Sequence, residues 1–486
     1  MPPFARKVFK SFTQSFAGSG INFISSLISG YFYALFLGPA VYGIWQTARV
    51  FLSYSTFTSL GIPFTMRRDF ITLRSEGKIA EAEKLAHVTV TYSFIINPLA
   101  GLIFILIAVF SNSQIALRIS FLVVGIMYIT ELFTGIGNIL HKGINDYKTI
   151  ALGDTIYGAG LLLLIPFVYY FGYYALLTGY VAISVIRALF FFVRRPVKYK
   201  WDLDLNVLKR LVFSAFPLFL VTIISTVFTS IDRLLIAGLL NFENVGFYSL
   251  SSFLSQPLTL ALNSLSVVIF THLNEKYGSR KDSMVIEKQT YIPQKLFSNL
   301  MAPVIGMGIV VLPQLTQLFL PKYTEGVIAA QINIFAILFF RLAGFSSGGL
   351  FILDKHRFTA LSFFLAGILK TTGSYWALKA GYGIEAVALF TLLAYLFYYV
   401  IMLYYVNRSL GNNFTLFISR LRESLICPLI ILAASASYIK FSPAIFEFLN
   451  TEKPWQQIFL GLGFILISGA WFIYMAISDI VKILRR

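Results

Sequence analysis

The 486-residue chain has one cysteine, Cys427, and four histidines. A lone thiol excludes an internal disulfide and a cysteine-based metal cluster. The histidines, at positions 87, 141, 272 and 356, all fall at or near the ends of apolar segments, where solvated loop residues are commoner than ligands or proton relays. The sequence also lacks G-x-x-x-x-G-K-[ST], H-E-x-x-H and G-x-S-x-G. The chain is therefore not expected to hydrolyse ATP on its own.

Charge is the next scarcity. Asp, Glu, Lys and Arg make up 12% of the chain, against about 25% in soluble proteins, whereas hydrophobic residues make up 57%. Apolar runs of roughly 20 residues, the length a helix needs to cross the ~30 Å hydrocarbon layer, recur from end to end. A helix satisfies its own backbone hydrogen bonds where water is absent. The chain is therefore predicted to be an all-α polytopic membrane protein.

About 14 transmembrane helices are expected. They are residues 12–37, 41–62, 86–109, 115–140, 150–171, 174–193, 212–238, 245–270, 293–319, 325–353, 358–379, 383–406, 424–440 and 456–480. The first run follows a basic N-region but has no small-x-small cleavage site, so we expect it to stay as a helix. The gaps between runs are too short to hold an extramembrane domain.

The distribution of Lys and Arg supports this number of helices. With the N-terminus inside, most of the 39 basic residues fall in gaps that face the cytoplasm, as the positive-inside rule requires. Both termini are therefore predicted to be cytoplasmic. This asymmetry, together with attraction to anionic headgroups, accounts for most of the net charge of +18 without a nucleic-acid partner.

A weak internal repeat divides the chain. The turn LGPAVYGIW (Leu37–Trp45) corresponds, 203 residues later, to LNFENVGFY (Leu240–Tyr248), and the same offset carries the basic loop 67–84 onto 270–287. Transporters are often built from duplicated helix sets. We expect six-helix bundles at 1–200 and 201–410 in the same orientation, followed by two additional helices at 411–486.

Several ionisable residues fall deep inside predicted helices. The basic ones are Arg49, Arg118, Arg187, Arg233, Arg341 and Lys370, whereas the acidic ones are fewer, with Glu131 near the middle and Asp232 nearer the exterior. A charge at such depth costs at least ~2.5 kcal/mol on insertion scales, so it usually faces a bundle interior or a wet cavity.

Internal salt bridges are the simpler explanation for these charges. Asp232 and Arg233 point about 100° apart as helix neighbours, so each needs another partner. Arg118 and Arg187 lie near helix ends, where a side chain can reach the interface.

The deepest cations favour a different explanation. Glu131 alone cannot neutralise Arg49, Arg341 and Lys370. We therefore expect a cationic, water-filled cavity between the halves, suited to an anionic substrate, because Arg binds phosphate with two parallel hydrogen bonds.

Three stretches carry a resemblance to a known family: FLGPAVYGIW (36–45), SLGIPFTMRRDF (59–70) and IDRLLIAGLLNFENVGFYSLSSF (231–253). With the six-plus-six-plus-two plan, they resemble the multidrug/oligosaccharidyl-lipid/polysaccharide (MOP) exporter superfamily, which has the MATE-like fold. Within it the chain is most similar to the polysaccharide transporters, the Wzx-type flippases of O-antigen or capsule repeat units. The likeness covers nearly the whole chain, although 14 helices also fit lipid II flippases.

The resemblance implies transport without an enzyme activity, a metal or a cofactor. The expected substrate is an undecaprenyl-pyrophosphate-linked oligosaccharide, moved from the cytoplasmic to the periplasmic leaflet of the bacterial inner membrane by alternating access coupled to H⁺ or Na⁺. A polysaccharide polymerase, a chain-length regulator and membrane lipids are candidate partners. We hypothesise that Arg49, Arg341 and Lys370 attract phosphates or acidic sugars, that Arg233 does so near the exterior gate, and that aromatic side chains stack on sugars. The candidate coupling carboxylates are Glu131 and Asp232.

Three alternatives remain open. A multidrug antiporter of the same fold would need acids in its cavity to hold cationic drugs, but here deep bases outnumber deep acids. A membrane-embedded polymerase or glycosyltransferase would need a large exterior loop with catalytic acids. A peptidoglycan-precursor (lipid II) flippase would use the same physics on a different head group.

Overall fold

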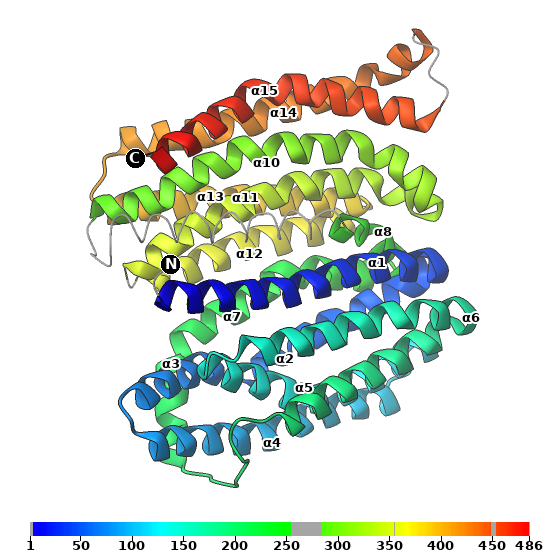
Figure 1. Ribbon diagram of the computed structural model, residues 1–486. Helices are drawn as coiled ribbons and strands as arrows, with labels where there is room; N and C mark the ends of the chain where they lie inside the picture. The colour runs from blue at the N-terminus through cyan, green and yellow to red at the C-terminus, as the bar shows by residue number, and fades with distance from the viewer. Residues whose placement is uncertain (1–2, 254–282, 354, 449–452, 486) are drawn as a thin grey trace. The chain divides into compact units, whose positions relative to one another are not determined.

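The computed structural model describes residues 3–253, 283–353, 355–448 and 453–485, and its regular elements there are all helical (Figure 1). Ten of these helices are long and apolar enough to cross a membrane. The prediction of an all-α polytopic membrane protein is confirmed. The chain divides into two units, Met1–Thr226 and Val227–Arg486. The predicted division at 200 and 410 stays a prediction.

The first unit consists of long helices and two short ones. They are α1 (Pro3–Ser53), α2 (Ser55–Thr58), α3 (Ile62–Ser75), α4 (Ile79–Phe110), α5 (Ile115–Gly143), α6 (Tyr147–Val193) and the beginning of α7 (Leu205–Leu239). The second unit contains the rest of α7, then α8 (Phe242–Tyr248), α10 (Ser283–Phe319), the 3-10 helix η1 (Pro321–Gly326), α11 (Val327–Ile352), α12 (His356–Lys379), α13 (Ile384–Ser409), α14 (Phe414–Phe448) and α15 (Pro454–Arg485).

Two of the long helices each consist of two arms. Gly38 in α1 has φ 71° and Gly172 in α6 has φ 64°, so the backbone leaves the helical region at each. Only glycine adopts positive φ without steric cost. These breaks coincide with the predicted gaps between 12–37 and 41–62 and between 150–171 and 174–193.

Candidate span 245–270 lies mostly outside the described residues, and α12 is not among the ten helices that are long and apolar enough to cross a membrane. The number 14 and the orientation of the termini stay predictions.

One predicted helix is wrong at its end. The run 41–62 does not continue to residue 62, because α1 ends at Ser53, α2 adds one turn, and Leu60 (φ 47°) and Gly61 (φ 74°) are left-handed. A Cβ on Gly61 would lie 2.9 Å from Phe219 Cβ, so the backbone approaches α7 closely there. The chain restarts at Ile62 as α3.

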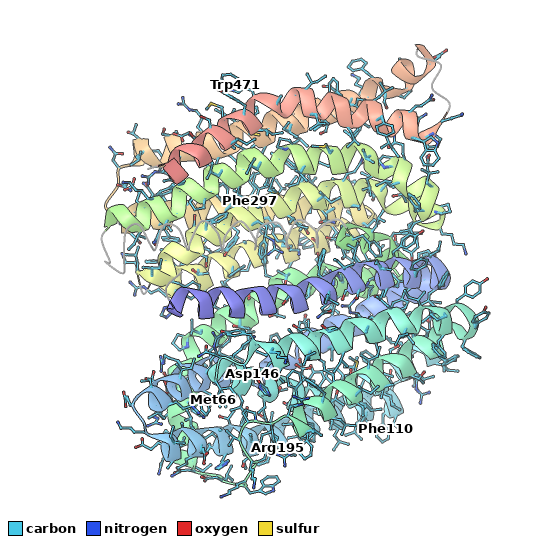
Figure 2. All side chains as sticks on the ribbon, in the orientation of Figure 1. Met66, Phe110, Asp146, Arg195, Phe297 and Trp471 are labelled. Atoms are coloured by element: carbon cyan, nitrogen blue, oxygen red, sulfur yellow. The ribbon has the colours of Figure 1, made fainter. Side chains whose placement is uncertain are left out.

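Small residues bring the helices of the first unit together. α1 packs on α6, and α4 packs on α5. At the second contact Gly101 and Gly125 face each other, since a Cβ on either would lie within 2.6 Å of the other's carbonyl oxygen. Close backbone approach through glycine is the usual means of association between membrane helices. Nearby, Met66, labelled in Figure 2, belongs to a buried apolar cluster formed mainly by α3, α4 and α5.

In the second unit α11 packs on α13, and α10 packs on α11, α14 and α15 (Figure 1). A buried polar chain joins them: Tyr399 contacts Gln294, its hydroxyl lies 2.5 Å from Ser424 Oγ, and Ser298 donates to the Ser424 carbonyl at 2.6 Å. Gly306 closes the contact with α14, because a Cβ there would lie 2.4 Å from Ile431 Cγ2. The two additional helices are thus firmly attached to α10. The basic loop at 270–282 lies outside the described residues, as does His272.

Candidate functional site

The most deeply buried charges lie in the second unit, on α7 and α12. Lys370 has no exposed surface, and its Nζ donates to Asp232 Oδ2 at 3.1 Å and to the Phe228 carbonyl at 2.9 Å. Asp232 is 6% exposed. Two charges removed from water in this way are tolerated because they neutralise each other and their hydrogen bonds are satisfied.

Polar groups from three further helices complete this network. Tyr248 Oη of α8 lies 2.9 Å from Asp232 Oδ2, 3.3 Å from Thr391 Oγ1 of α13 and 3.2 Å from Asn333 Oδ1 of α11. A phenol has one proton, and the charged carboxylate is its strongest acceptor. Tyr248 therefore donates to Asp232, and Thr391 can donate to Tyr248. The Lys370 ammonium thus contacts two oxygen atoms of α7, and the carboxylate that it neutralises is also held by Tyr248 of α8.

The other two predicted cations of this unit lie around the same network. The Arg233 backbone N–H donates to Asp232 Oδ1 at 3.0 Å, and its guanidinium lies 3.4 Å from Ser252 Oγ. The Arg341 guanidinium stands 5.5 Å from the Phe340 ring centre. Both side chains are partly exposed, in contrast to Lys370.

An aromatic layer separates Arg341 from Lys370. The ring of Phe340 packs 4.9 Å from that of Tyr395, and Lys370 Nζ lies 5.4 Å from the Tyr395 ring centre and 5.6 Å from that of Phe228. Phe228 and Tyr395 are buried. In this conformation these rings pack and make cation–π contacts rather than presenting faces to a sugar.

Arg49 belongs to the first unit. It lies on the second arm of α1, about 16 Å along the helix from the Gly38 turn. Its side chain is exposed, and the phenols of Tyr180, Tyr157 and Tyr42 lie within electrostatic range of its guanidinium. Arg49 thus places an exposed guanidinium deep in an apolar helix.

Two other deep arginines have structural roles, as the salt-bridge and helix-end explanation predicted. Arg187 Nη2 lies 2.7 Å from Asp154 Oδ1 and so ties together the two arms of α6. Arg118 donates to the carbonyls of Ala108 and Val109 at 2.9 and 3.0 Å, which satisfies the C-terminal end of α4. Neither side chain is a strong candidate for binding a substrate.

Glu131, on α5 of the first unit, lines a cavity of about 220 Å³. Its Oε2 accepts a hydrogen bond from Thr134 Oγ1 at 2.8 Å, and it makes no ion pair with any described residue. The cavity is lined by residues of α2, α3, α4 and α5 and of the turn after α2, and it carries many hydroxyl groups. Among the described residues, no cluster of His, Cys, Asp and Glu could hold a metal ion through three such ligands.

Sequence reasoning thus singled out these charged residues but missed the side chains that contact them. It did not pair Lys370 with Asp232, and it did not include Asn333 or Thr391. Tyr248 was visible in the sequence as the last residue of the repeated turn motif. Asn333 and Thr391 carry no signal in a single sequence, because buried polar residues are common in long helices.

Comparison with known proteins covers most of the chain. Residues 32–325, more than half of the 486, match the model of the family described as "Polysaccharide biosynthesis protein". A search of curated proteins finds no match.

Among solved structures the chain resembles the lipid II flippase MurJ in an inward closed conformation, with TM-score 0.71 and 14% identity, over 96% of this chain and 99% of that one. It also resembles an inward-facing multidrug resistance MATE family transporter of the MOP superfamily, with TM-score 0.63 and 12% identity, over 82% and 98% of the two chains. A MOP superfamily transporter from Pyrococcus furiosus gives TM-score 0.55 and 14% identity, over 83% and 95%. These likenesses establish the fold.

The fold is the one that these MOP superfamily transporters have. The helices able to span a membrane, the deep charges and the match over residues 32–325 lead to one assignment. The chain is a multi-pass membrane protein that belongs to the polysaccharide biosynthesis protein family and has the MATE-like fold of the MOP superfamily.

Proposed function

We propose that the chain is a flippase that moves an undecaprenyl-pyrophosphate-linked oligosaccharide, an O-antigen or capsule repeat unit, from the cytoplasmic to the periplasmic leaflet of the bacterial inner membrane. The observation that carries this proposal is the exposed guanidinium of Arg49, deep in an apolar helix of a chain that belongs to a polysaccharide biosynthesis family. A pyrophosphate and its sugars cannot cross hydrocarbon unaided, whereas the polyprenyl tail can remain in it.

The roles of the cations follow from their exposure. Arg49, Arg233 and Arg341 are at least partly exposed and are proposed to attract the phosphates or acidic sugars. Lys370 is fully buried against Asp232, so its proposed contact with substrate requires that this pair opens during the alternating-access cycle. A charge-assisted contact of each cation with phosphate contributes roughly 1.5–3 kcal/mol.

A second candidate is a flippase for a peptidoglycan precursor. The likeness to the lipid II flippase MurJ over 96% of this chain favours it. A cation-coupled multidrug antiporter fits less well, because the buried acid of the second unit is already neutralised by Lys370 and does not offer its charge to a cationic drug.

Gene deletion distinguishes these functions. Under the proposal, cells without the gene lose surface polysaccharide, remain viable, and accumulate the lipid-linked unit in the inner leaflet. Loss of viability with cell-wall failure would instead support the peptidoglycan precursor. Drug sensitivity with unchanged polysaccharide would support an antiporter.

A further inference from the structure

The hydroxyl of Tyr248 contacts the same carboxylate oxygen as the Lys370 ammonium. Tyr248 Oη lies 2.9 Å and Lys370 Nζ lies 3.1 Å from Asp232 Oδ2. The other oxygen of this carboxylate, Oδ1, accepts from the backbone N–H of Arg233 at 3.0 Å. Asp232 therefore has two uncharged donors, a phenol and a backbone N–H, in addition to its cation. Both donors would remain if the cation left.

Tyr248 and Lys370 differ in how firmly they are held. Tyr248 is the last residue of α8, which packs directly on η1, because a Cβ on Gly326 would lie 2.4 Å from the Phe247 carbonyl oxygen. The Phe247 ring also makes an edge contact with Tyr323 of η1, with the ring centres 6.3 Å apart. Lys370 carries its charge on a flexible four-carbon stem. When the pair opens, the ammonium is therefore the group that moves, and the phenol stays in place.

Two neighbouring polar side chains can strengthen the hydrogen bond that Tyr248 donates. Thr391 Oγ1 lies 3.3 Å from Tyr248 Oη, and Asn333 Oδ1 lies 3.2 Å from it. Asn333 is 5% exposed, and its Nδ2 has no hydrogen-bond partner in the part of the chain that the structure describes. Rotation of this amide would present Nδ2 to the phenol oxygen as a donor. A phenol that accepts a hydrogen bond is a stronger donor to its own acceptor, so these side chains can support an unpaired carboxylate.

We propose that Tyr248 is a positioning residue that keeps Asp232 ionised while Lys370 leaves the pair. This role rests on the proposed function, in which Lys370 contacts the substrate. A buried carboxylate that loses its cation takes up a proton unless hydrogen bonds stabilise its charged form. The side chains from α7, α8, α12, α13 and α11 that surround this carboxylate are, in that order, Arg233, Tyr248, Lys370, Tyr395 and the uncharged Asn333. With the phenol in place, Lys370 can leave and return without proton uptake by Asp232.

The test uses Lys370→Met as a permanent mimic of the opened pair, which needs no substrate. The melting temperature of the purified full-length protein in detergent is measured with and without Tyr248→Phe in three backgrounds: wild type, Lys370→Met, and Lys370→Met with Asp232→Asn. We expect the loss caused by Tyr248→Phe to be about twice as large or larger in Lys370→Met than in the other two backgrounds. In Lys370→Met this loss should shrink as the pH falls from about 8 to 5, because a proton then neutralises Asp232. In the wild-type background it should not change with pH.

Tyr399→Phe is the matched control, since it removes another buried hydroxyl of the second unit, one whose partners are Gln294 and Ser424. Its loss of melting temperature should be the same in wild type and in Lys370→Met at every pH. Should Lys370→Met not give a single symmetric peak in size-exclusion chromatography, Lys370→Gln serves as the uncharged background. An equal loss from Tyr248→Phe in wild type and in the uncharged background, or a loss there that does not depend on pH, would overturn the role of Tyr248. Either result would leave the flippase proposal to its own genetic test, because no transport is measured here.

Discussion

Lys370 Nζ lies 3.1 Å from Asp232 Oδ2, and this ion pair joins α12 to α7 in the interior of the second unit. Lys370 has no exposed surface and Asp232 almost none. The pair balances two charges that would each be costly alone, and it is the only ion pair among the described residues whose lysine is fully buried. Its opening would expose both a cation and an anion.

Removing one partner of this pair should destabilise the protein more than removing both. Lys370→Met leaves Asp232 without its cation, and Asp232→Asn leaves Lys370 without its anion, so each should cost about 3–5 kcal/mol. The double variant removes both charges and should recover most of that loss. Thermal unfolding in detergent, followed by size-exclusion fluorescence, measures the three melting temperatures against wild type.

Lys379→Met is the control for this series, because Lys379 is exposed at the end of the same helix, α12. Its melting temperature should match that of the wild type. A double variant less stable than both single variants would contradict the mutual neutralisation of Lys370 and Asp232.

Arg49 should be required for transport and not for folding. Arg49→Gln replaces the charged guanidinium with a neutral amide, and we expect surface polysaccharide in a complemented deletion strain to fall by about 10-fold or more, which corresponds to roughly 1.5–3 kcal/mol of lost phosphate binding. Arg49→Lys should keep part of the activity, since the charge remains but the planar fork is lost. The amount of protein in the membrane, measured by immunoblot, must stay unchanged.

Arg118→Gln provides the comparison. Arg118 satisfies carbonyls at the end of α4, so its loss should lower the melting temperature slightly and leave polysaccharide near the wild-type amount. Equal loss of polysaccharide in both variants would remove the specific role of Arg49.

The glycine crossing of α4 and α5 should not tolerate a methyl group. Gly101→Ala or Gly125→Ala would place a Cβ 2.5 or 2.6 Å from a backbone carbonyl oxygen of the other helix, so the helices must separate. We expect a loss of about 1–3 kcal/mol in stability from overpacking. Gly20→Ala, whose Cβ would meet nothing within 4 Å, should be neutral or stabilising by up to about 1 kcal/mol. Similar melting temperatures for Gly101→Ala and Gly20→Ala would argue against the close crossing.

Asp146, labelled in Figure 2 between α5 and α6, should stabilise the start of α6 in a pH-dependent way. It accepts from Thr149 N at 3.2 Å, Thr149 Oγ1 at 2.6 Å and His141 Nδ1 at 3.1 Å. Asp146→Ala removes this N-cap and should cost about 0.5–2 kcal/mol, whereas Asp146→Asn keeps an oxygen acceptor and should cost less.

The sign of the pH dependence follows from the same contacts. Partial burial alone would raise the pKa of Asp146, but the hydrogen bonds from Thr149 and the interaction with His141 hold the pKa below its usual value. The charged form therefore stabilises the fold above the unfolded pKa of about 3.9, and this contribution is lost as the pH falls through the lower folded value. The difference in melting temperature between wild type and Asp146→Asn should narrow below about pH 4. A widening difference there would contradict this assignment.

Much of the fold could be predicted from the sequence because the membrane imposes simple rules. Apolar length predicted the helix arms, and the predicted gaps fall at Gly38 and Gly172, where a glycine turn lets the chain reverse. The break at Leu60 and Gly61 could not be predicted, because it depends on how closely the backbone approaches Phe219, far along the chain.

The site was predictable only in its charges. The sequence shows that Lys370 and Asp232 lie in apolar runs, where a charge is costly. Their pairing requires that each side chain lies on the helix face that meets the other helix, and this depends on the packing of residues 138 positions apart in sequence. The cavity beside Glu131 is lined by residues of the break between α1 and α3, so it could not be predicted from the sequence either. The predicted water-filled cavity between the halves stays a prediction.

Transport itself is the most direct measurement of the central claim. The purified protein is reconstituted in liposomes with an undecaprenyl-pyrophosphate-linked oligosaccharide, and the fraction of oligosaccharide accessible to an external glycosidase is followed with time. The account predicts that wild-type protein makes the inner-leaflet pool accessible and that the Arg49→Gln variant does so at least about 10-fold more slowly. Accessibility that rises no faster with wild-type protein than in protein-free liposomes, under an imposed sodium or proton gradient, would contradict it.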